Sequence, residues 1–157
     1  MVKALEKILL ALLSIIMAIL VFFACWQVFF RYVIGKPSTF TVELLKYSMI
    51  WMSMLGASYV FAKREHLAFL FLKNKYTGKK KAGLVFIIDL ILCCFAFFVM
   101  TWGGIDLVYR TYFETTPALG LSMGLVYSVI PLSGIIIVII KLFHLHNDIK
   151  SFIGDKK

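Results

Sequence analysis

The fold is decided by residues 26–66, which read WQVFFRYVIGKPSTFTVELLKYSMIWMSMLGASYVFAKREH. The stretch begins in the last turns of one apolar run, crosses a short polar link, and passes through a second apolar run to a basic end. The link contains Gly35 and Pro37, residue types that end helices. The stretch therefore predicts a helical hairpin, and the rest of the chain repeats its pattern of apolar span and charged end.

The composition indicates an integral membrane protein. The chain has 157 residues, of which 62% are hydrophobic, whereas soluble domains hold about 45–50% apolar residues. The excess stands in blocks, as in membrane-spanning segments. The net charge of +9 comes from basic residues between these blocks, which favours loops held in the cytoplasm over nucleic-acid binding. Cys25, Cys93 and Cys94 lie within the blocks without a CxxC spacing, so we interpret them as small buried hydrophobes.

We predict an all-α integral membrane protein in which residues 1–157 form a single domain of four transmembrane helices. The expected spans are about residues 8–30, 42–62, 82–105 and 118–140, with a basic loop over 63–81. The first span holds 23 uncharged residues, which is too long for the apolar region of a cleaved signal peptide. We therefore expect it to remain as a permanent span, about 34 Å long.

The distribution of lysine and arginine predicts the orientation. The amino terminus, the loop over 63–81 and the tail from Lys141 together hold 13 of these residues, and the opposite side holds 4. Cytoplasmic segments carry the excess of positive charge. Both termini and the 63–81 loop are therefore expected in the cytoplasm, and the 31–46 link and the 106–117 segment outside.

Three polar or amphipathic side chains stand near the outer end of the first span. Trp26 and Tyr32 are expected at interfacial depth, where amphipathic rings are favoured. Gln27 is expected to face another helix, because an unpartnered amide in hydrocarbon is costly.

Charged residues follow in the link and in the first turn of the second span. Glu43 and Lys46 are three residues apart and share a helix face. Two interpretations remain open: Arg31 and Glu43 form a packed pair that closes the hairpin, or all three charges are solvated at the interface. Further along, Gly56 and Ala57 offer a small patch on which a neighbouring helix can approach closely.

One carboxylate, that of Asp89, falls within the third span. An intramembrane carboxylate suggests a functional role such as ion coupling. The alternative is that Asp89 bonds to a neighbouring helix or to a snorkelling lysine. Beyond this span, Asp106, Arg110 and Glu114 follow at spacings of four, which predicts that the helix continues past the membrane with paired charges on one face.

The fourth span carries a stripe of small residues and one proline. Gly120, Gly124 and Ser128 are spaced by four, which favours a helix-packing face. Pro131 lacks a backbone donor and is expected to bend the helix near Tyr127.

Motifs for most other functions are missing from the sequence. The histidines, His66, His144 and His146, lie in segments expected in the cytoplasm, whereas a membrane cytochrome needs paired histidines within spans. His144 and His146 are two apart and make a weak metal site. No GxSxG, HExxH or phosphate loop is present, and the halves show no internal repeat of the kind found in many transporters. An accessory membrane subunit fits these features better than a stand-alone transporter.

A series of short motifs runs from residue 26 to residue 131. It comprises Trp26-Gln27-Val28, Arg31-Tyr32, Gly35-Lys36-Pro37, Glu43, Gly56, Glu65-His66, Thr116-Pro117-Ala118-Leu119-Gly120, and Tyr127 with Pro131. In this order and spacing the motifs resemble the small membrane (Q-type) subunit of tripartite ATP-independent periplasmic (TRAP) transporters.

The resemblance implies a sodium-coupled secondary transporter of three proteins in the bacterial inner membrane. A periplasmic binding protein would capture an organic anion, such as a C4-dicarboxylate or sialic acid. A large membrane subunit would bind sodium and move the substrate. The small subunit would pack beside it as a fixed scaffold and help to dock the binding protein.

The resemblance also implies where the functional features of this chain lie. Arg31, Glu43 and their hairpin would shape the periplasmic end of the scaffold. Because the sequence stops at Lys157, we expect the large subunit to be a separate chain, and we expect no cofactor or metal on this one. The structural and interface candidates are Trp26, Gln27, Arg31, Tyr32, Pro37, Glu43, Lys46, Gly56, Glu65, His66, Asp89, Pro117, Gly120, Gly124 and Pro131.

Two functions of other classes remain open. One is a self-contained proton-coupled exporter of small cations, with Glu43 or Asp89 as the switching carboxylate. The other is a redox-anchor subunit that binds haem or quinone.

Overall fold

The fold comes from a computed structural model that describes residues 2–36, 38–63 and 79–154, with the backbone alone for residues 2, 3, 79–86 and 145–154. Within these segments the regular elements are helices, and one isolated β-bridge joins Thr115 to Ser122. The all-α prediction is therefore confirmed for the described residues. The helices are α1 (Val2–Phe29), α2 (Thr39–Ala62), α4 (Lys79–Phe95), α5 (Gly103–Arg110), α6 (Met123–Tyr127) and α7 (Val129–Gly154), with π-helical segments η1 (Phe30–Ile34) and η2 (Ala96–Trp102).

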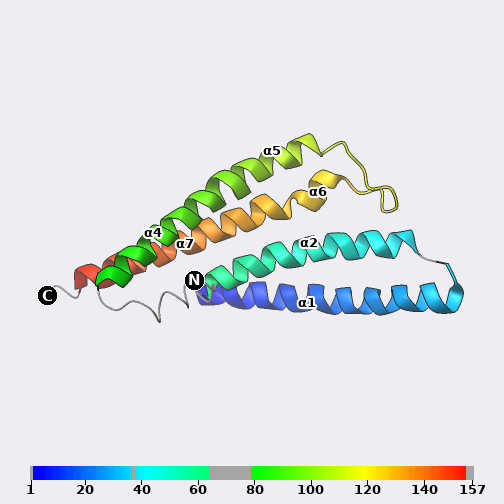
Figure 1. Ribbon diagram of the computed structural model, residues 1–157, viewed down its shortest axis with the longest axis horizontal. Coiled ribbons are helices and arrows are strands. Elements are labelled where there is room, and N and C mark those ends of the chain that lie inside the picture. Colours follow the sequence, from blue (N-terminus) through cyan, green and yellow to red (C-terminus); the bar gives the residue numbers. More distant parts are fainter. Residues whose placement is uncertain (1, 37, 64–78, 155–157) are drawn as a thin grey trace.

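Two helical hairpins make up the described molecule. In Figure 1, α1 and α2 lie side by side and run in opposite directions, and the rod formed by α4, η2 and α5 lies along the rod formed by α6 and α7. Helix α2 also packs against α7, so it lies between α1 and the second hairpin. The beginnings of α1 and α4 and the ends of α2 and α7 gather at the same end of the molecule, and the hairpins diverge toward the other end (Figure 1).

The first hairpin turns at Gly35 and Ser38. Gly35 has a φ of 71°, in the left-handed region that glycine adopts without strain, and it ends η1. The Ser38 hydroxyl caps α2 by accepting a hydrogen bond from the backbone N–H of Thr41 at 3.4 Å. The hairpin predicted from residues 26–66 is thus confirmed, although Pro37 itself lies outside the described residues.

Three helical stretches of the described chain are long and apolar enough to cross a membrane. They are Ala4–Ile34, Ile87–Arg110 and Met123–His144. Helix α2 has 24 residues and is about 36 Å long, which suffices to cross. It is not among the three, because polar residues such as Glu43, Lys46 and Ser53 lower its mean hydropathy.

The core lies where α1, α2 and α7 meet. Leu9, Leu55 and Val129, one from each of these helices, form a buried cluster. In the second hairpin, glycines instead of large side chains lie where the two rods pack against each other. A β-carbon at Gly134 would lie 2.7 Å from Thr101 Oγ1, and one at Gly104 would lie 2.9 Å from the Pro131 ring. Such short distances mean that the two rods approach each other too closely for a side chain at these positions.

Two predicted helix ends are wrong. The fourth span begins at Met123 and not near residue 118, because residues 115–122 form a turn in which Gly120 has a φ of 65°. Gly120 therefore does not belong to a helical stripe. The helix of the third span ends at Arg110, so Glu114 lies in the turn and does not continue the row of paired charges.

Two other predictions in this region are confirmed. Asp106 and Arg110 form the expected pair, with Arg110 Nε 2.8 Å from Asp106 Oδ2. The helix is interrupted at Ser128, next to Tyr127 and three residues before Pro131, where α6 ends and α7 begins.

Candidate functional site

The Glu43 carboxylate holds the turn over residues 115–122 against the first turns of α2. Its Oε2 accepts hydrogen bonds from the backbone N–H groups of Ala118 and Leu119, each at 3.1 Å. Successive backbone N–H groups that point to one spot form a natural binding site for an anion. The carboxylate thus ties the turn of the second hairpin to the first turns of α2 in the first hairpin.

The turn is shaped from inside by Thr116, which is buried. Its hydroxyl accepts a hydrogen bond from the N–H of Leu121 at 3.0 Å, and its carbonyl accepts one from Gly120 at 3.0 Å. These bonds leave the N–H groups of Ala118 and Leu119 facing Glu43. Pro117, on the same turn, is exposed.

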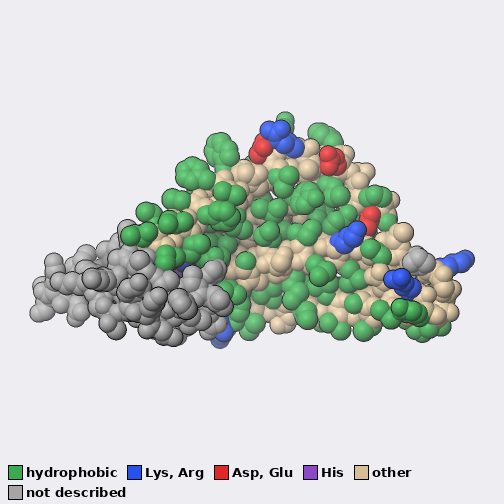
Figure 2. Space-filling view, viewed as in Figure 1, with side chains coloured by type: hydrophobic (Ala, Val, Ile, Leu, Met, Phe, Trp, Pro, Cys, Tyr) green, Lys and Arg blue, Asp and Glu red, His purple; other side chains and the backbone are tan. Residues whose placement is uncertain are grey.

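The structure bears out neither interpretation in full: Arg31 and Lys46 are exposed, but the Glu43 carboxylate is bound by the turn. Arg31 is exposed, and among the described residues no ion pair joins it to Glu43, whose carboxylate is used by the turn. The packed pair is therefore wrong. Lys46 is likewise exposed. Figure 2 shows Lys and Arg side chains standing out at the end of the molecule where α1 meets α2.

A buried ion pair joins α4 to α7. Asp89 and Lys141 are each 5% exposed, and the Lys141 ammonium donates a hydrogen bond to Asp89 Oδ1. The same ammonium lies 5.4 Å from the centre of the Phe61 ring on α2, a cation–π distance. Of the two alternatives for Asp89, the structure has the bond to a neighbouring helix, and the pair connects three helices.

A second polar contact joins the two hairpins further along. The Trp51 indole N–H on α2 donates to the carbonyl of Val126 on α6 at 3.1 Å. The interruption of the helix at Ser128 makes carbonyls of α6 available, and a carbonyl in hydrocarbon needs a donor. About two turns after Trp51 on α2, the Ser58 hydroxyl lies 3.5 Å from the carbonyl of Ser133 on α7.

Sequence reasoning missed Lys141, Trp51 and Thr116. The sequence places Lys141 at the start of the basic tail expected in the cytoplasm, whereas its side chain is buried. The sequence contains one clue that a basic partner such as Lys141 is needed, namely the carboxylate of Asp89, because a buried charge requires an opposite charge nearby. The position of the partner, 52 residues away, follows only from the packing of α4 on α7.

The remaining candidates are spread over the molecule. Trp26 and Tyr32 are 46% and 78% exposed, and Trp26 stacks on Phe22. Gln27 is half-buried.

Of two further candidate glycines, Gly124 serves close packing, and Gly56 lies at an ordinary contact distance from α1. A β-carbon at Gly56 would meet only Leu13 of α1, at 3.9 Å, whereas one at Gly124 would lie 2.9 Å from the carbonyl of Val108. Glu65 and His66 lie outside the described residues.

Among the described residues, no group of three or more His, Cys, Asp and Glu side chains is placed to hold a metal ion. The arrangement instead consists of ties between helices. It can fix the hairpins relative to one another. The charged groups of Asp89, Lys141 and Glu43 are bound within the chain, whereas Arg31 and Lys46 are exposed.

Comparisons with known proteins extend over most of the chain. A family model described as "Tripartite ATP-independent periplasmic transporters, DctQ component" matches residues 17–151. A Haemophilus influenzae protein, provisionally named TRAP transporter small permease protein, is 31% identical over 137 residues, which cover 86% of this chain and 81% of the relative. The sialic acid TRAP transporter small permease protein SiaQ of Vibrio cholerae is 24% identical over 139 residues, which cover 88% and 80%. The family match therefore takes in both hairpins.

Proposed function

Because this chain belongs to the DctQ family of small permease subunits of tripartite ATP-independent periplasmic transporters, we propose that it is the fixed scaffold of its transporter. In this proposal the chain itself carries neither the substrate nor the coupling ion. As a member of this family it is a transport protein of the inner membrane, and it has apolar helices long enough to cross that membrane.

The observation that carries the proposal is that the carboxylates of Asp89 and Glu43 are both bound by other parts of the chain. Asp89 is neutralised by Lys141 in a buried pair, and the carboxylate of Glu43 accepts two backbone N–H groups. A carboxylate that couples transport to an ion must be able to exchange its partner during the cycle. Both carboxylates are instead bound to neighbouring helices or turns, as a static brace requires.

The proposed system has two further proteins. A separate large membrane subunit binds sodium ions and moves the substrate, and a periplasmic binding protein delivers an organic anion. The Vibrio cholerae relative is named for sialic acid, which makes sialic acid the first substrate to try, with C4-dicarboxylates and related carboxylates next. The end that carries Arg31 and the turn held by Glu43 faces the periplasm and helps to dock the binding protein.

The proposal includes four membrane spans, with α2 as the fourth. Helix α2 is antiparallel to α1 and is covered by α1 on one side and α7 on another. A helix with protein on two sides needs fewer apolar residues than one surrounded by lipid. Both termini then lie in the cytoplasm, where the excess of lysine and arginine places them.

Reconstitution into proteoliposomes tests the proposal. The chain alone should give no uptake of labelled sialic acid or C4-dicarboxylate. The chain with its large subunit, the binding protein and an inward sodium gradient should give uptake, and the large subunit without this chain should give little.

Other results would point to the other functions. Transport of any solute by the chain alone, driven by a proton gradient, would indicate a self-contained exporter. A haem absorbance band or bound quinone in the purified chain would indicate a redox anchor. Either result would reject the scaffold.

A further inference from the structure

The outer end of the second hairpin carries four aromatic side chains that the rest of the described chain leaves uncovered. They are Trp102, Tyr109, Tyr112 and Phe113, and each is between 60% and 89% exposed. The rings of Tyr112 and Phe113 meet edge to face, with their centroids 5.4 Å apart. We refer to these four residues as the outer aromatic patch. An uncovered aromatic surface of this kind requires an apolar or amphipathic neighbour.

The patch continues an apolar row along the rod of α4, η2 and α5. The row consists of exposed residues at spacings of three and four, namely Ile87, Ile91, Phe95, Phe98, Trp102, Ile105 and Tyr109. From residue 87 to residue 109 it is about 33 Å long, close to the hydrocarbon thickness of about 30 Å. In Figure 1 this rod forms the edge of the molecule away from the first hairpin, and Figure 2 shows apolar side chains standing out along that edge. The row therefore has the length and the position of a surface that faces lipid.

The side chains of the row change in kind toward its outer end. Up to Phe98 they are isoleucine and phenylalanine, which are wholly apolar, and from Trp102 onward they include tryptophan and tyrosine. An amphipathic ring is favoured where hydrocarbon meets the headgroups, because its polar group reaches water. The exposed ion pair of Asp106 and Arg110 lies on the same helix as these rings, and charges cost little at that depth. The order of residues thus places the outer interface near Tyr109.

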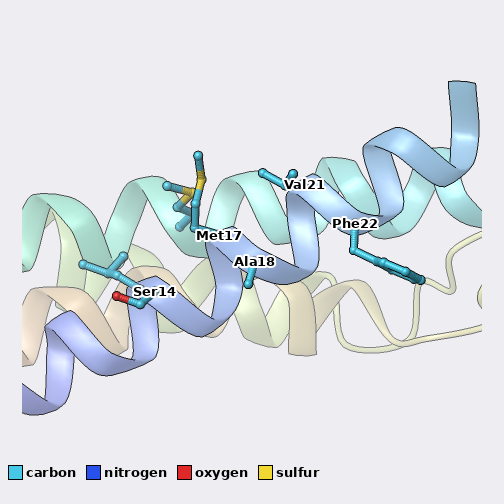
Figure 3. Close-up of a pocket in the computed structure, with 7 residues that line it drawn as sticks. Ser14, Met17, Ala18, Val21 and Phe22 are labelled. Atoms are coloured by element: carbon cyan, nitrogen blue, oxygen red, sulfur yellow. The ribbon is translucent and has the colours of Figure 1, made fainter.

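The first span shows the same order of side chains. On α1, the exposed Ile15 and Ile19 are followed by Phe22 and Trp26, whose rings stack with centroids 6.2 Å apart, and Tyr32 is exposed beyond them. Figure 3 shows Phe22 on α1, where it lines an open groove between α1 and α2. The outer aromatic patch is on and beside α5, at the opposite edge of the molecule from this groove (Figure 1).

Lipid fits the patch better than water or a protein helix. In water, four uncovered rings would form an apolar surface of the kind that soluble proteins rarely expose. A partner helix is favoured by small residues, which let two backbones approach closely, whereas each position of this row holds a large side chain. The row is also continuous with the membrane-spanning stretch Ile87–Arg110, so the lipid that covers its inner part continues onto the patch.

We propose that the outer aromatic patch lies in the outer leaflet of the membrane, where the headgroups meet the acyl chains, and anchors the second hairpin at that depth. Residues 106–113 are then interfacial, instead of outside the membrane as the sequence predicts. The turn over residues 115–122 lies at the membrane surface. The proposal rests on the proposed function, which gives this end its orientation and requires a scaffold that keeps its depth while another protein moves.

Electron paramagnetic resonance of spin labels measures the depth of the patch. The three native cysteines are replaced by alanine, and one nitroxide is attached through Tyr109→Cys or Phe113→Cys, with Phe98→Cys and Lys36→Cys as the standards for lipid and water. The full chain and its large subunit are reconstituted in vesicles of phosphatidylethanolamine and phosphatidylglycerol. Oxygen collects in lipid and a nickel chelate stays in water. We expect the oxygen-to-nickel accessibility ratio at Tyr109 and Phe113 to exceed the ratio at Lys36 severalfold and to approach that at Phe98.

Two results would overturn the proposal. Labels at Tyr109 and Phe113 that meet the nickel chelate as readily as the label at Lys36 would put the patch in water. Low accessibility to both reagents would show that a protein covers the patch. A failure of the proposed function is seen separately: the chain would not co-purify with its large subunit, and the depth of the patch would then be measured on the chain alone.

Thiol reactivity in intact cells gives a second measurement. Phe113→Cys should react with a membrane-impermeant maleimide about tenfold more slowly than Glu114→Cys or slower still, because apolar surroundings disfavour the reactive thiolate. Glu114 is the matched control, since it is the next residue and is also exposed. Both side chains are exposed, so neither substitution removes a buried contact. Equal rates at the two positions would contradict the proposal.

Discussion

The buried pair of Asp89 and Lys141 is the most consequential contact between single side chains. Taking two charges out of water costs several kcal/mol for each ion, and their attraction offsets this only with good geometry. The pair is therefore weak evidence for stability but strong evidence for a fixed arrangement, because either helix alone would expose an uncompensated charge to the membrane interior. The Lys141 ammonium also contacts the Phe61 ring, so α2 belongs to the same fixed arrangement.

Removing one member of this pair should destabilise the chain far more than removing both. Asp89→Asn should lower the free energy of unfolding in detergent by about 3 kcal/mol or more, because it leaves the Lys141 ammonium buried and unpaired. Asp89→Leu combined with Lys141→Met should return stability to within about 1 kcal/mol of the wild type. Chemical unfolding followed by tryptophan fluorescence measures both.

The exposed pair of Asp106 and Arg110 provides the matched control. Asp106→Asn should change the unfolding free energy by at most about 1 kcal/mol, since exposed ion pairs contribute little. If Asp89→Asn were equally mild, the pair would not be buried in the way the structure has it.

The Glu43 carboxylate should be essential to the shape of the turn over residues 115–122. Hydrogen bonds to a charged acceptor are worth about 1.5–3 kcal/mol, against about 0.5–1.5 for neutral ones, so Glu43→Gln should weaken both bonds to the turn. The amide hydrogens of Ala118 and Leu119 should then exchange with deuterium about tenfold faster or more. Glu114→Gln, just before the turn, should leave these rates unchanged, and equal acceleration by both variants would contradict the role assigned to Glu43.

The helices themselves could be read from the sequence, but the helix ends on either side of the turn over residues 115–122 could not. The apolar runs, Gly35 and the break before Pro131 are local signals, and each gave the right element. The turn over residues 115–122 has its conformation set by Glu43, which is 75 residues away from Ala118 in the chain. A local pattern of glycines at spacings of four therefore looked like helix at Gly120, where the backbone is left-handed.

The same limit applies to the candidate site. Periodicity predicted which residues share a face but not which helix that face meets. Asp89 was found because a carboxylate in an apolar run is conspicuous, whereas Lys141 and Trp51 became visible only once α4, α7 and α2 were placed side by side. Arg31 and Glu43 are close in sequence and of opposite charge, yet the backbone N–H groups of a distant turn take the carboxylate.

The close contact between α7 and η2 should tolerate no side chain. Gly134→Ala would place a methyl group 2.7 Å from Thr101 Oγ1, so the rods must separate, at a cost of about 1–3 kcal/mol. Gly103→Ala is the matched control, because its β-carbon would meet only the carbonyl of Phe98, at 3.8 Å. That change should be neutral or stabilise the helix by up to about 1 kcal/mol. Thermal unfolding of the two variants in the same detergent separates the effects.

For the whole molecule, the membrane crossing of α2 is the part of the proposed topology that a direct measurement tests. Its length would allow it to cross the membrane, and its packing between α1 and α7 would let it cross with fewer apolar residues than its neighbours, as proposed. If α2 crosses, Lys36 and Lys63, which flank it, lie on opposite sides of the membrane. If α2 does not cross, Lys36 and Lys63 lie on the same side. The lysines and arginines would then no longer be concentrated on one side of the membrane, which is the basis of the predicted orientation.

Cysteine labelling distinguishes these cases. In a background with Cys25, Cys93 and Cys94 replaced by alanine, Lys36→Cys should react with a membrane-impermeant maleimide in intact cells. Lys63→Cys should react only after the inner membrane is permeabilised. Both sites lie beside exposed helix ends, so differences in burial do not explain a difference in labelling. Equal labelling of the two sites in intact cells would mean that α2 stays on one side, and the proposal of four membrane spans would then fail.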